Sequence, residues 1–208
     1  LYRERHRENY LPFRKLVYRE AEKIYFISED GKTYFEKILG QKEEKTSVNY
    51  LGTKDFGLNP EKASNKLKLV SCSFSVALKR VELIAYALKE IDNIEIEWTH
   101  IGSGPSQGYF EKEIRSSLKE KDNISYQFLG LISNEKVMQL YQNEHFDLFI
   151  NTSEFEGIPI GMMEAMSFGI PCLGTDTGGV REIIENGKNG FLAEQYPEPK
   201  EIAERISG

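Results

Sequence analysis

The chain has 208 residues, of which 39% are hydrophobic and 29% charged, and its formal net charge at pH 7 is −6. This length allows one large domain, or one domain with part of another, around a substantial core. The negative charge argues against a nucleic-acid partner, because phosphate backbones are bound by clustered Lys and Arg. No apolar run approaches the roughly 20 residues that span a bilayer, and the N-terminus does not resemble a signal peptide, so we expect a cytoplasmic protein.

The first fifty residues are predicted to alternate between helix and strand. Scattered apolar positions in a charged background predict a helix over residues 1–21 that is broken near Pro12. Strands are expected at Lys23–Ser28 and Thr46–Leu51, separated by a helix that ends at Leu39. Basic residues among the first twenty alternate with Glu, which is typical of a solvated helix, although they also leave open a role at the inner face of a membrane.

A polar segment, Lys54–Lys66, has the composition of a linker, and strands and helices alternate regularly after it. This alternation predicts an α/β protein with a doubly wound parallel sheet that binds its ligand at the carboxyl ends of the strands. The expected strands are Leu67–Phe74, Ile94–Ile101, Ser125–Leu129, Asp147–Asn151, Ile170–Gly174 and Phe191–Ala193. The expected helices are Val81–Leu88, Gly108–Glu120, Asn134–Asn143, one that begins at Pro159, Val180–Asn186 and Glu201–Ile206.

Two carboxylates flank the start of the helix that begins at Pro159. Glu156 lies in the loop before this helix, and Glu164 lies inside it. Free backbone N–H groups and the positive end of the helix dipole favour an anion at such a start, so both acids would border a bound anion. An ionised carboxylate only accepts hydrogen bonds, and the two acids therefore suit sugar or ribose hydroxyls rather than phosphates.

The run from Asp147 to Leu192 resembles the nucleotide-sugar signature of retaining glycosyltransferases with the GT-B fold, in the group 1/family 4 class. The shared pattern is an acid, seven residues, a second acid in Glu-Ala-Met, then Gly-x-Pro, Gly-Gly-x-x-Glu and Asn-Gly-Phe-Leu. It is matched by Glu156, Glu164–Met166, Gly169–Pro171, Gly178–Glu182 and Asn189–Leu192. The resemblance implies that residues 1–58 are the end of an N-terminal acceptor domain. Residues 59–208 would then be a Rossmann-like domain that binds the nucleotide-sugar donor.

The resemblance also implies roles for individual residues. Glu156 would be catalytic, binding the donor sugar hydroxyls or lying on its reactive face, and Glu164 would bind the ribose. The donor diphosphate would contact Lys79 and the amides of Gly157 and Ile158. Further residues that the resemblance brings to the donor are Gly102, Gly104, Arg80, Ile132, Thr177, Gly178 and Gly179, although the loop Thr177–Gly179 fits a purely structural turn equally well.

The chain departs from the family pattern at three positions near the expected diphosphate. Phe74 stands where the common pattern has a second cation, Arg80 replaces the usual Gly, and Pro159 stands where many members have Gly. Arg80 would compensate for the missing cation only if its side chain pointed toward the diphosphate, and Pro159 removes one backbone donor from the helix start. Neutralisation of the diphosphate is therefore the part of the prediction that depends most on structure.

The function implied is transfer of a sugar from a donor such as a UDP or GDP sugar to a hydroxyl of a glycan or lipid-linked acceptor, with retention, in bacterial-type polysaccharide synthesis. No cofactor or divalent metal is expected, since Lys79 and the helix start supply the charge and no Asp-x-Asp pair occurs. One alternative is a nucleotide-sugar binding module without turnover, which self-associates through residues 1–58. Another is a GT-B epimerase. A dinucleotide oxidoreductase is disfavoured, because Gly102-x-Gly104 lacks the third glycine.

Overall fold

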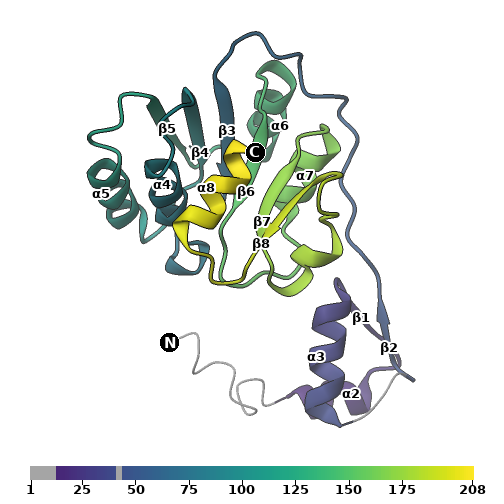
Figure 1. The fold of residues 1–208 in the computed structure, drawn as a ribbon. Coiled ribbons are helices and arrows are strands. Elements are labelled where there is room, and N and C mark those ends of the chain that lie inside the picture. The colour runs from purple at the N-terminus through teal and green to yellow at the C-terminus, as the bar shows by residue number, and fades with distance from the viewer. Residues whose placement is uncertain (1–12, 41–43) are drawn as a thin grey trace. The chain divides into compact units, whose positions relative to one another are not determined.

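A computed structural model describes residues 13–40 and 44–208, so the helix break expected near Pro12 lies outside the described residues. The chain divides into two compact units, Leu1–Leu51 and Gly52–Gly208 (Figure 1). None of the described helices combines the length and the apolar character that crossing a bilayer requires.

Within the described residues, the first unit contains two parallel strands and two helices. Its elements are α2 (Arg14–Glu20), β1 (Ile24–Phe26), α3 (Glu29–Leu39) and β2 (Thr46–Val48), with Ile24 opposite Thr46 in the two-stranded sheet. Helix α3 starts at Ser28, whose Oγ accepts a hydrogen bond from the Gly31 amide at 3.0 Å, and ends at Gly40 with φ of 65°. The expected order of helix and strand is confirmed here.

The second unit is built on a six-stranded parallel sheet. Its strands are β3 (Leu67–Cys72), β4 (Ile96–Ile101), β5 (Ile124–Gly130), β6 (Leu148–Asn151), β7 (Cys172–Thr175) and β8 (Gly190–Ala193). Their order across the sheet is β5-β4-β3-β6-β7-β8. The chain adds strands outward from β3 on one side and then from β6 on the other, which confirms the predicted doubly wound α/β class. The reversal of strand order places the topological switch point between β3 and β6.

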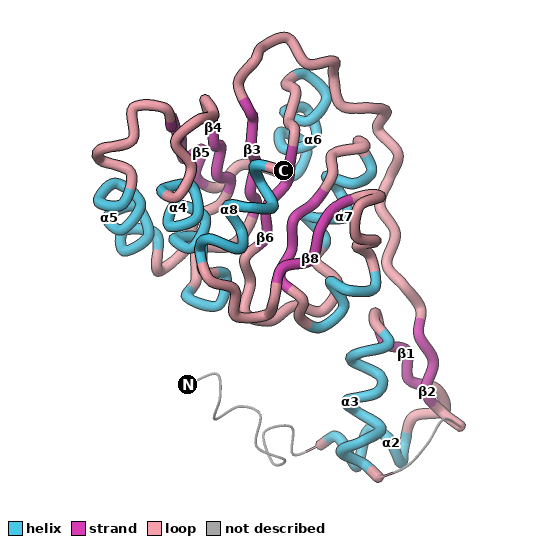
Figure 2. The backbone as a smooth tube through the Cα atoms, in the orientation of Figure 1, coloured by secondary structure: helices cyan, strands magenta, loops and turns pink. Residues whose placement is uncertain are grey.

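Helices cover both faces of this sheet (Figures 1 and 2). One face carries α4 (Val81–Lys89), α5 (Gln107–Ser117) and α8 (Pro199–Ser207), and the other carries α6 (Asn134–Asn143) and α7 (Ile160–Ser167). Trp98 is buried beneath the first layer, and Phe149 and Tyr141 are buried beneath the second. Because side chains alternate along a strand, each buried strand contributes to both cores.

The prediction of one helix is wrong. The chain from Val180 to Asn186 does not form an α-helix, and a short 3₁₀ turn, η2 (Gly178–Glu182), takes its place. The side chain of Asn189 accepts from the Glu185 amide at 2.8 Å and donates to the Ile183 carbonyl at 2.9 Å. These side-chain bonds occupy backbone groups that a continuing helix would need.

The linker packs on the second unit instead of standing free of it. The ring of Phe56 stacks on that of Phe168 with a centroid distance of 6.0 Å, and Gln142 Nε2 donates to the Phe56 carbonyl at 3.1 Å. Asn59 Nδ2 donates to the Glu144 carbonyl at 2.9 Å. These contacts explain why the compact units divide after Leu51, earlier than the domain boundary expected after residue 58.

Candidate functional site

The candidate site lies at the carboxyl ends of β3 and β6, where the strand order reverses. The segment after β3 includes the 3₁₀ turn η1 (Ala77–Lys79), and the loop after β6 carries Glu156 to the start of α7. In doubly wound sheets ligands bind in the crevice at this position. The topology therefore places Lys79 and Glu156, which are far apart in the sequence, on neighbouring strand ends.

The structure brings these two side chains into contact. Lys79 Nζ lies 2.5 Å from Glu156 Oε1, and the side chains are 21% and 10% exposed. The same Glu156 oxygen also accepts from Ser153 Oγ at 2.6 Å and from Asn151 Nδ2 at 3.1 Å. An ammonium group has three donors, so Lys79 can bind an anion while it keeps its bond to Glu156. The result is a fixed pair of opposite charges at the switch point.

Backbone donors lie next to this pair, at the start of α7. The N–H groups of Gly157, Ile158, Ile160 and Gly161 donate to no acceptor in the described part of the chain. Pro159 has no N–H, so the expected gap in this row of donors is present, and Pro159 itself precedes the helix as its N-cap residue. The remaining amides are suited to an anion, as at other helix starts.

The two predicted glycines of the loop after β4 are required by close backbone packing. A Cβ on Gly102, which has φ of 137°, would lie 1.9 Å from the Ser73 carbonyl oxygen. A Cβ on Gly104 would lie 2.6 Å from the Ser75 carbonyl oxygen. The two glycines let the loop after β4 lie directly against the segment after β3, at the same edge of the sheet as Lys79.

The loop Thr177–Gly179 packs against the chain that carries Glu156. A Cβ on Gly178, where φ is 51°, would lie 1.8 Å from the Glu156 carbonyl oxygen. The Gly179 amide donates to the Gly157 carbonyl at 2.9 Å, and Thr177 Oγ1 donates to the Glu154 carbonyl at 2.9 Å. These contacts support the structural interpretation of the loop, which buttresses the position of Glu156.

Arg80 also contacts protein backbone. Its Nε donates to the Thr152 carbonyl at 2.7 Å, and its Nη2 donates to the carbonyls of Ser153 at 3.1 Å and Gln195 at 2.8 Å. Burial lowers the pKa of Arg80 despite the opposing field of nearby Glu154. To neutralise a diphosphate the guanidinium would have to leave these carbonyls. The sequence could not show this, because the direction of a long side chain depends on the packed fold.

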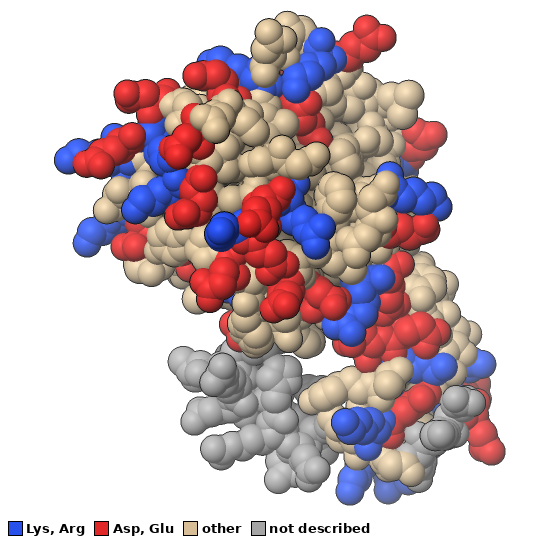
Figure 3. Space-filling view, in the orientation of Figure 1, with Lys and Arg blue, Asp and Glu red and all other residues tan. Residues whose placement is uncertain are grey.

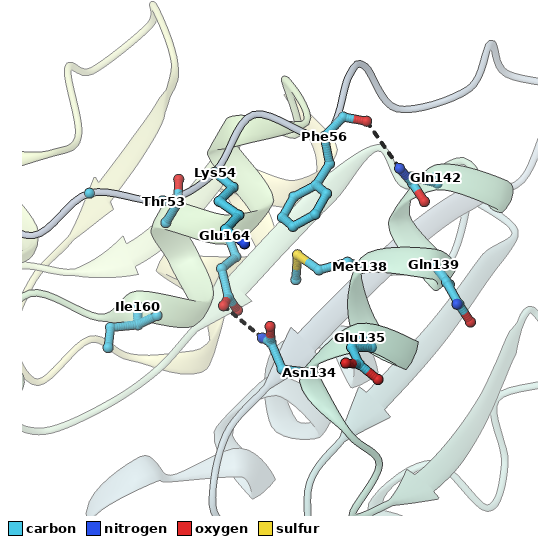
Figure 4. A pocket seen from close by; sticks show the side chains of 11 residues that line it. Thr53, Lys54, Phe56, Asn134, Glu135, Met138, Gln139, Gln142, Ile160 and Glu164 are labelled. Carbon is cyan, nitrogen blue, oxygen red and sulfur yellow. Dashed lines mark hydrogen bonds between the residues drawn. The ribbon is translucent and has the colours of Figure 1, made fainter.

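Glu164 lies apart from Glu156, in a groove of about 600 Å³ between α6, α7 and the linker (Figure 4). Its Oε1 accepts a hydrogen bond from Asn134 Nδ2 at 2.7 Å. Linker residues form the opposite wall, and Met138 lies between them and Asn134 (Figure 4). The lining residues are Gly52, Thr53, Lys54, Phe56, Asn134, Glu135, Met138, Gln139, Gln142, Ile160 and Glu164. Ile132 is half-buried in the core beneath α6 and α7.

Sequence reasoning missed several residues that shape these two regions. Asn151 is the last residue of the buried strand β6 and Ser153 follows shortly after it, and this position was a usable signal for polar groups at the sheet edge. Asn134 begins a helix, where a side-chain contact to a different helix gives no local sequence pattern. The groove wall formed by Lys54 and Phe56 lies in a segment whose composition indicates only a linker.

Comparisons with known proteins identify the class. The family model "Glycosyl transferases group 1" matches residues 59–207, so the chain belongs to this family. It is 28% identical over 166 residues to N-acetyl-alpha-D-glucosaminyl L-malate synthase of Bacillus anthracis, and 30% identical over 181 residues to poly(glycerol-phosphate) alpha-glucosyltransferase of Bacillus subtilis. These matches cover 79% and 83% of the chain but only 38% and 25% of the relatives, so the chain spans less than half of either one.

Solved glycosyltransferase structures share the fold. Anabaena Alr3699/HepE in complex with UDP superimposes with a TM-score of 0.82 at 24% identity, over 99% of this chain and 58% of that chain. Sucrose-phosphate synthase from Thermosynechococcus elongatus gives a TM-score of 0.80 at 17% identity, over 99% of this chain and 53% of that chain. The group 1 GT-B class indicated by the sequence is thereby confirmed, and the assignment of retaining stereochemistry stays a prediction.

Proposed function

We propose that the protein transfers a sugar from a nucleotide diphosphate sugar to a hydroxyl acceptor with retention at the anomeric carbon. In this proposal the second unit binds the donor. The observation that carries it is the contact of Lys79 with Glu156 at the switch point, next to the unpaired amides of Gly157 and Ile158. A fixed cation, an acid and backbone donors at one sheet edge match the needs of a charged leaving group and a sugar.

The chemistry requires stabilisation of the departing diphosphate. Charge builds on the diphosphate oxygens as the glycosidic C–O bond breaks, and donors that are already in place stabilise it without reorganisation. Lys79 and the start of α7 supply these donors, and Glu156 would bind the sugar hydroxyls or lie on its reactive face. We propose that no divalent metal is required, because the ammonium and the amides address the same charge. Transfer that persists in the presence of EDTA would support this part.

The nucleoside would lie on the other side of α7, with Glu164 accepting from the ribose hydroxyls in the groove. The half-buried Ile132 and the loop at Gly102 and Gly104 would border the donor. The Anabaena Alr3699/HepE structures contain UDP and UDP-glucose, which makes a uridine donor the first to test and a guanosine donor the second. The carboxylate of Glu164 has to exchange Asn134 for a ribose hydroxyl, an exchange that the exposed position of Asn134 allows.

The proposed acceptor is supported by the activities named for the relatives, and we propose a role for the first unit in binding it. Poly(glycerol-phosphate) alpha-glucosyltransferase is among the relatives, which supports a glycan or lipid-linked acceptor and a place in polysaccharide synthesis. Residues 1–58 would be the end of the acceptor domain and a region of self-association. A cytoplasmic enzyme at the inner membrane face fits such an acceptor. On the face of the second unit drawn in Figure 3, basic and acidic side chains are interspersed, so that face offers no clear membrane-binding surface.

Calorimetric titration with UDP, GDP and ADP tests donor binding. We expect one of the three to bind and the Lys79→Ala variant to lose about tenfold or more in affinity, since a hydrogen bond to a charged group contributes roughly 1.5–3 kcal/mol. Lys89→Ala is the matched control, because Lys89 lies exposed at the C-terminal end of α4. Equal loss in both variants, or no binding by the wild type, would refute the proposed donor site.

The alternative of a binding module without turnover is favoured by one observation, because both candidate acids and Lys79 lie within the second unit. Incubation of the chain with a bound sugar nucleotide and hydroxyl acceptors distinguishes the two functions. Acceptor-dependent product would show a transferase, and NMR of its anomeric configuration would test retention. Binding with only spontaneous hydrolysis would identify a donor-binding module.

A further inference from the structure

Arg80 has an unusual backbone conformation for its residue type. Its φ is 46° and its ψ is 44°, and it is the only non-glycine residue with positive φ among those described. A side chain in this region is strained, and such strain persists only where the surrounding structure holds it in place. The question is therefore which contacts hold Arg80 there.

The guanidinium joins three segments of the second unit. Its three hydrogen bonds reach the loop after β6 at Thr152 and Ser153 and the connection between β8 and α8 at Gln195. The group also lies over the ring of Tyr196, 5.5 Å from its centroid. All three acceptors are backbone carbonyls, so the contacts fix the path of the main chain.

Return contacts link the same loop to the turn that carries Lys79. Thr152 Oγ1 lies 3.1 Å from the Lys79 carbonyl and 2.9 Å from the Arg80 carbonyl, as a donor shared between them. The Glu154 amide donates to the Leu78 carbonyl at 2.8 Å. The turn after β3 and the loop after β6 are thus bound to each other at Leu78, Lys79 and Arg80.

The connection between β8 and α8 holds the loop from a third direction. Gln195 Nε2 donates to the Glu154 carbonyl at 3.2 Å, and Tyr196 Oη donates to Glu154 Oε1 at 3.1 Å. Glu154 is two residues before Glu156, so this segment and Arg80 together hold the main chain close to Glu156.

From these contacts we propose that Arg80 is a positioning residue that holds Lys79 and Glu156 together across the switch point, and that it does not itself bind the donor anion. The predicted effect of Arg80 on nucleotide affinity rests on the proposed function. Its predicted effect on the loop after β6 does not. The positioning role explains how a residue that replaces glycine in this family pattern is retained in a strained conformation.

The substitution Arg80→Lys separates positioning from charge. Lysine keeps the positive charge but lacks the planar guanidinium that bonds three carbonyls at once. A positioning role predicts that Arg80→Lys loses UDP affinity about as much as Arg80→Gly does, by about tenfold, while the affinity for uridine is unchanged. In the Lys79→Ala background neither change should reduce UDP affinity further, because the two effects act through the same contact. Arg115→Lys, on the exposed surface of α5, is the matched control.

Hydrogen exchange measured by mass spectrometry provides a test without ligand. Amides in residues 152–157 should exchange at least about tenfold faster in both Arg80→Lys and Arg80→Gly, and those of α5 and α6 should be unchanged. Arg80→Gly also relieves the strained φ, so a folded protein is expected. If the Arg80→Lys variant exchanges its amide hydrogens at the wild-type rate and binds UDP with the wild-type affinity, the positioning role is overturned. If the loop loosens but the wild type binds no nucleotide, the proposed function fails and the positioning role stands.

Discussion

The two acids that the sequence pairs have very different surroundings. Glu156 accepts from Lys79, Asn151 and Ser153, and its side chain is 10% exposed. Within the described residues, the carboxylate of Glu164 accepts one hydrogen bond, from Asn134, and Glu164 lies half-buried at the edge of an open groove. A group that must meet developing charge benefits from being held in advance, whereas a group that binds a nucleoside must exchange its partner for the ligand. We infer that the donor site is rigid around Glu156, where the sugar reacts, and adjustable around Glu164, where the nucleoside binds.

The largest expected effect on stability is that of a substitution at Gly178, which packs behind Glu156. Gly178→Ala would place a Cβ 1.8 Å from the Glu156 carbonyl oxygen in a residue with φ of 51°. We expect it to lower the free energy of unfolding by about 3 kcal/mol, from overpacking and backbone strain together. The control is Gly187→Ala, because Gly187 has φ of 75° but no atom within 4 Å of the added Cβ, so only about 1 kcal/mol is expected. Urea denaturation measures both, and equal losses would contradict the close packing behind Glu156.

Glutamine substitutions at the two acids test the division of roles directly. Glu164→Gln should weaken nucleoside diphosphate binding by about ten- to hundredfold, since hydrogen bonds from ribose to a charged acceptor are lost. Glu156→Gln should leave that affinity nearly unchanged and reduce sugar transfer. Calorimetry with UDP or GDP compares the two, and similar losses of affinity would show that the acids do not serve separate ends of the donor.

A smaller effect is expected where the linker is attached next to the groove. Asp147 accepts from Lys62 Nζ at 2.8 Å, the Lys68 amide at 2.8 Å and His145 Nε2 at 3.0 Å. Burial alone would raise the pKa of Asp147, but hydrogen bonds from Lys62, the Lys68 amide and His145 outweigh it and lower the pKa. A carboxyl whose pKa is lowered by folding stabilises the protein above its unfolded pKa of about 3.9, and this stabilisation is lost as the pH falls through the folded value.

Asp147→Asn should therefore reduce the free energy of unfolding by about 1 kcal/mol at pH 7 and make it less sensitive to acid below about pH 4. Denaturation at pH 7 and pH 3 measures both quantities. UDP affinity should fall slightly, because the linker forms a wall of the groove, while exchange of the Glu156 loop should not change. An acid dependence identical to that of the wild type would show that Asp147 does not anchor the linker.

The sequence predicted the parts of the molecule that depend on local pattern and on a shared motif. It placed β6, the loop with Glu156, α7 and β7 in order, and the structure confirms these elements. It did not predict the 3₁₀ turn at Gly178–Glu182, since the bonds from the Asn189 side chain that replace a helix are not a periodic signal.

Contacts between distant segments were also beyond the sequence. His145 Nδ1 lies 2.6 Å from the carbonyl oxygen of Pro60 in the linker, a contact that no local spacing indicates. The direction of Arg80 and the packing of Phe56 on Phe168 depend in the same way on the assembled sheet and helices. Side chains whose partners come from another element carry no spacing rule, so these features require a structure.

The most direct test of the central claim is an NMR titration of the isotope-labelled chain with the nucleoside diphosphate that binds, compared with the matching nucleoside. The account predicts that the diphosphate shifts the amide signals of Gly157, Ile158, Ile160 and Gly161 and the Nζ signal of Lys79, whereas the nucleoside shifts only signals around Glu164 and Asn134. Shifts confined to the surface around Lys89 and Lys121, or equal shifts at Gly157 with both ligands, would contradict a diphosphate site at the switch point.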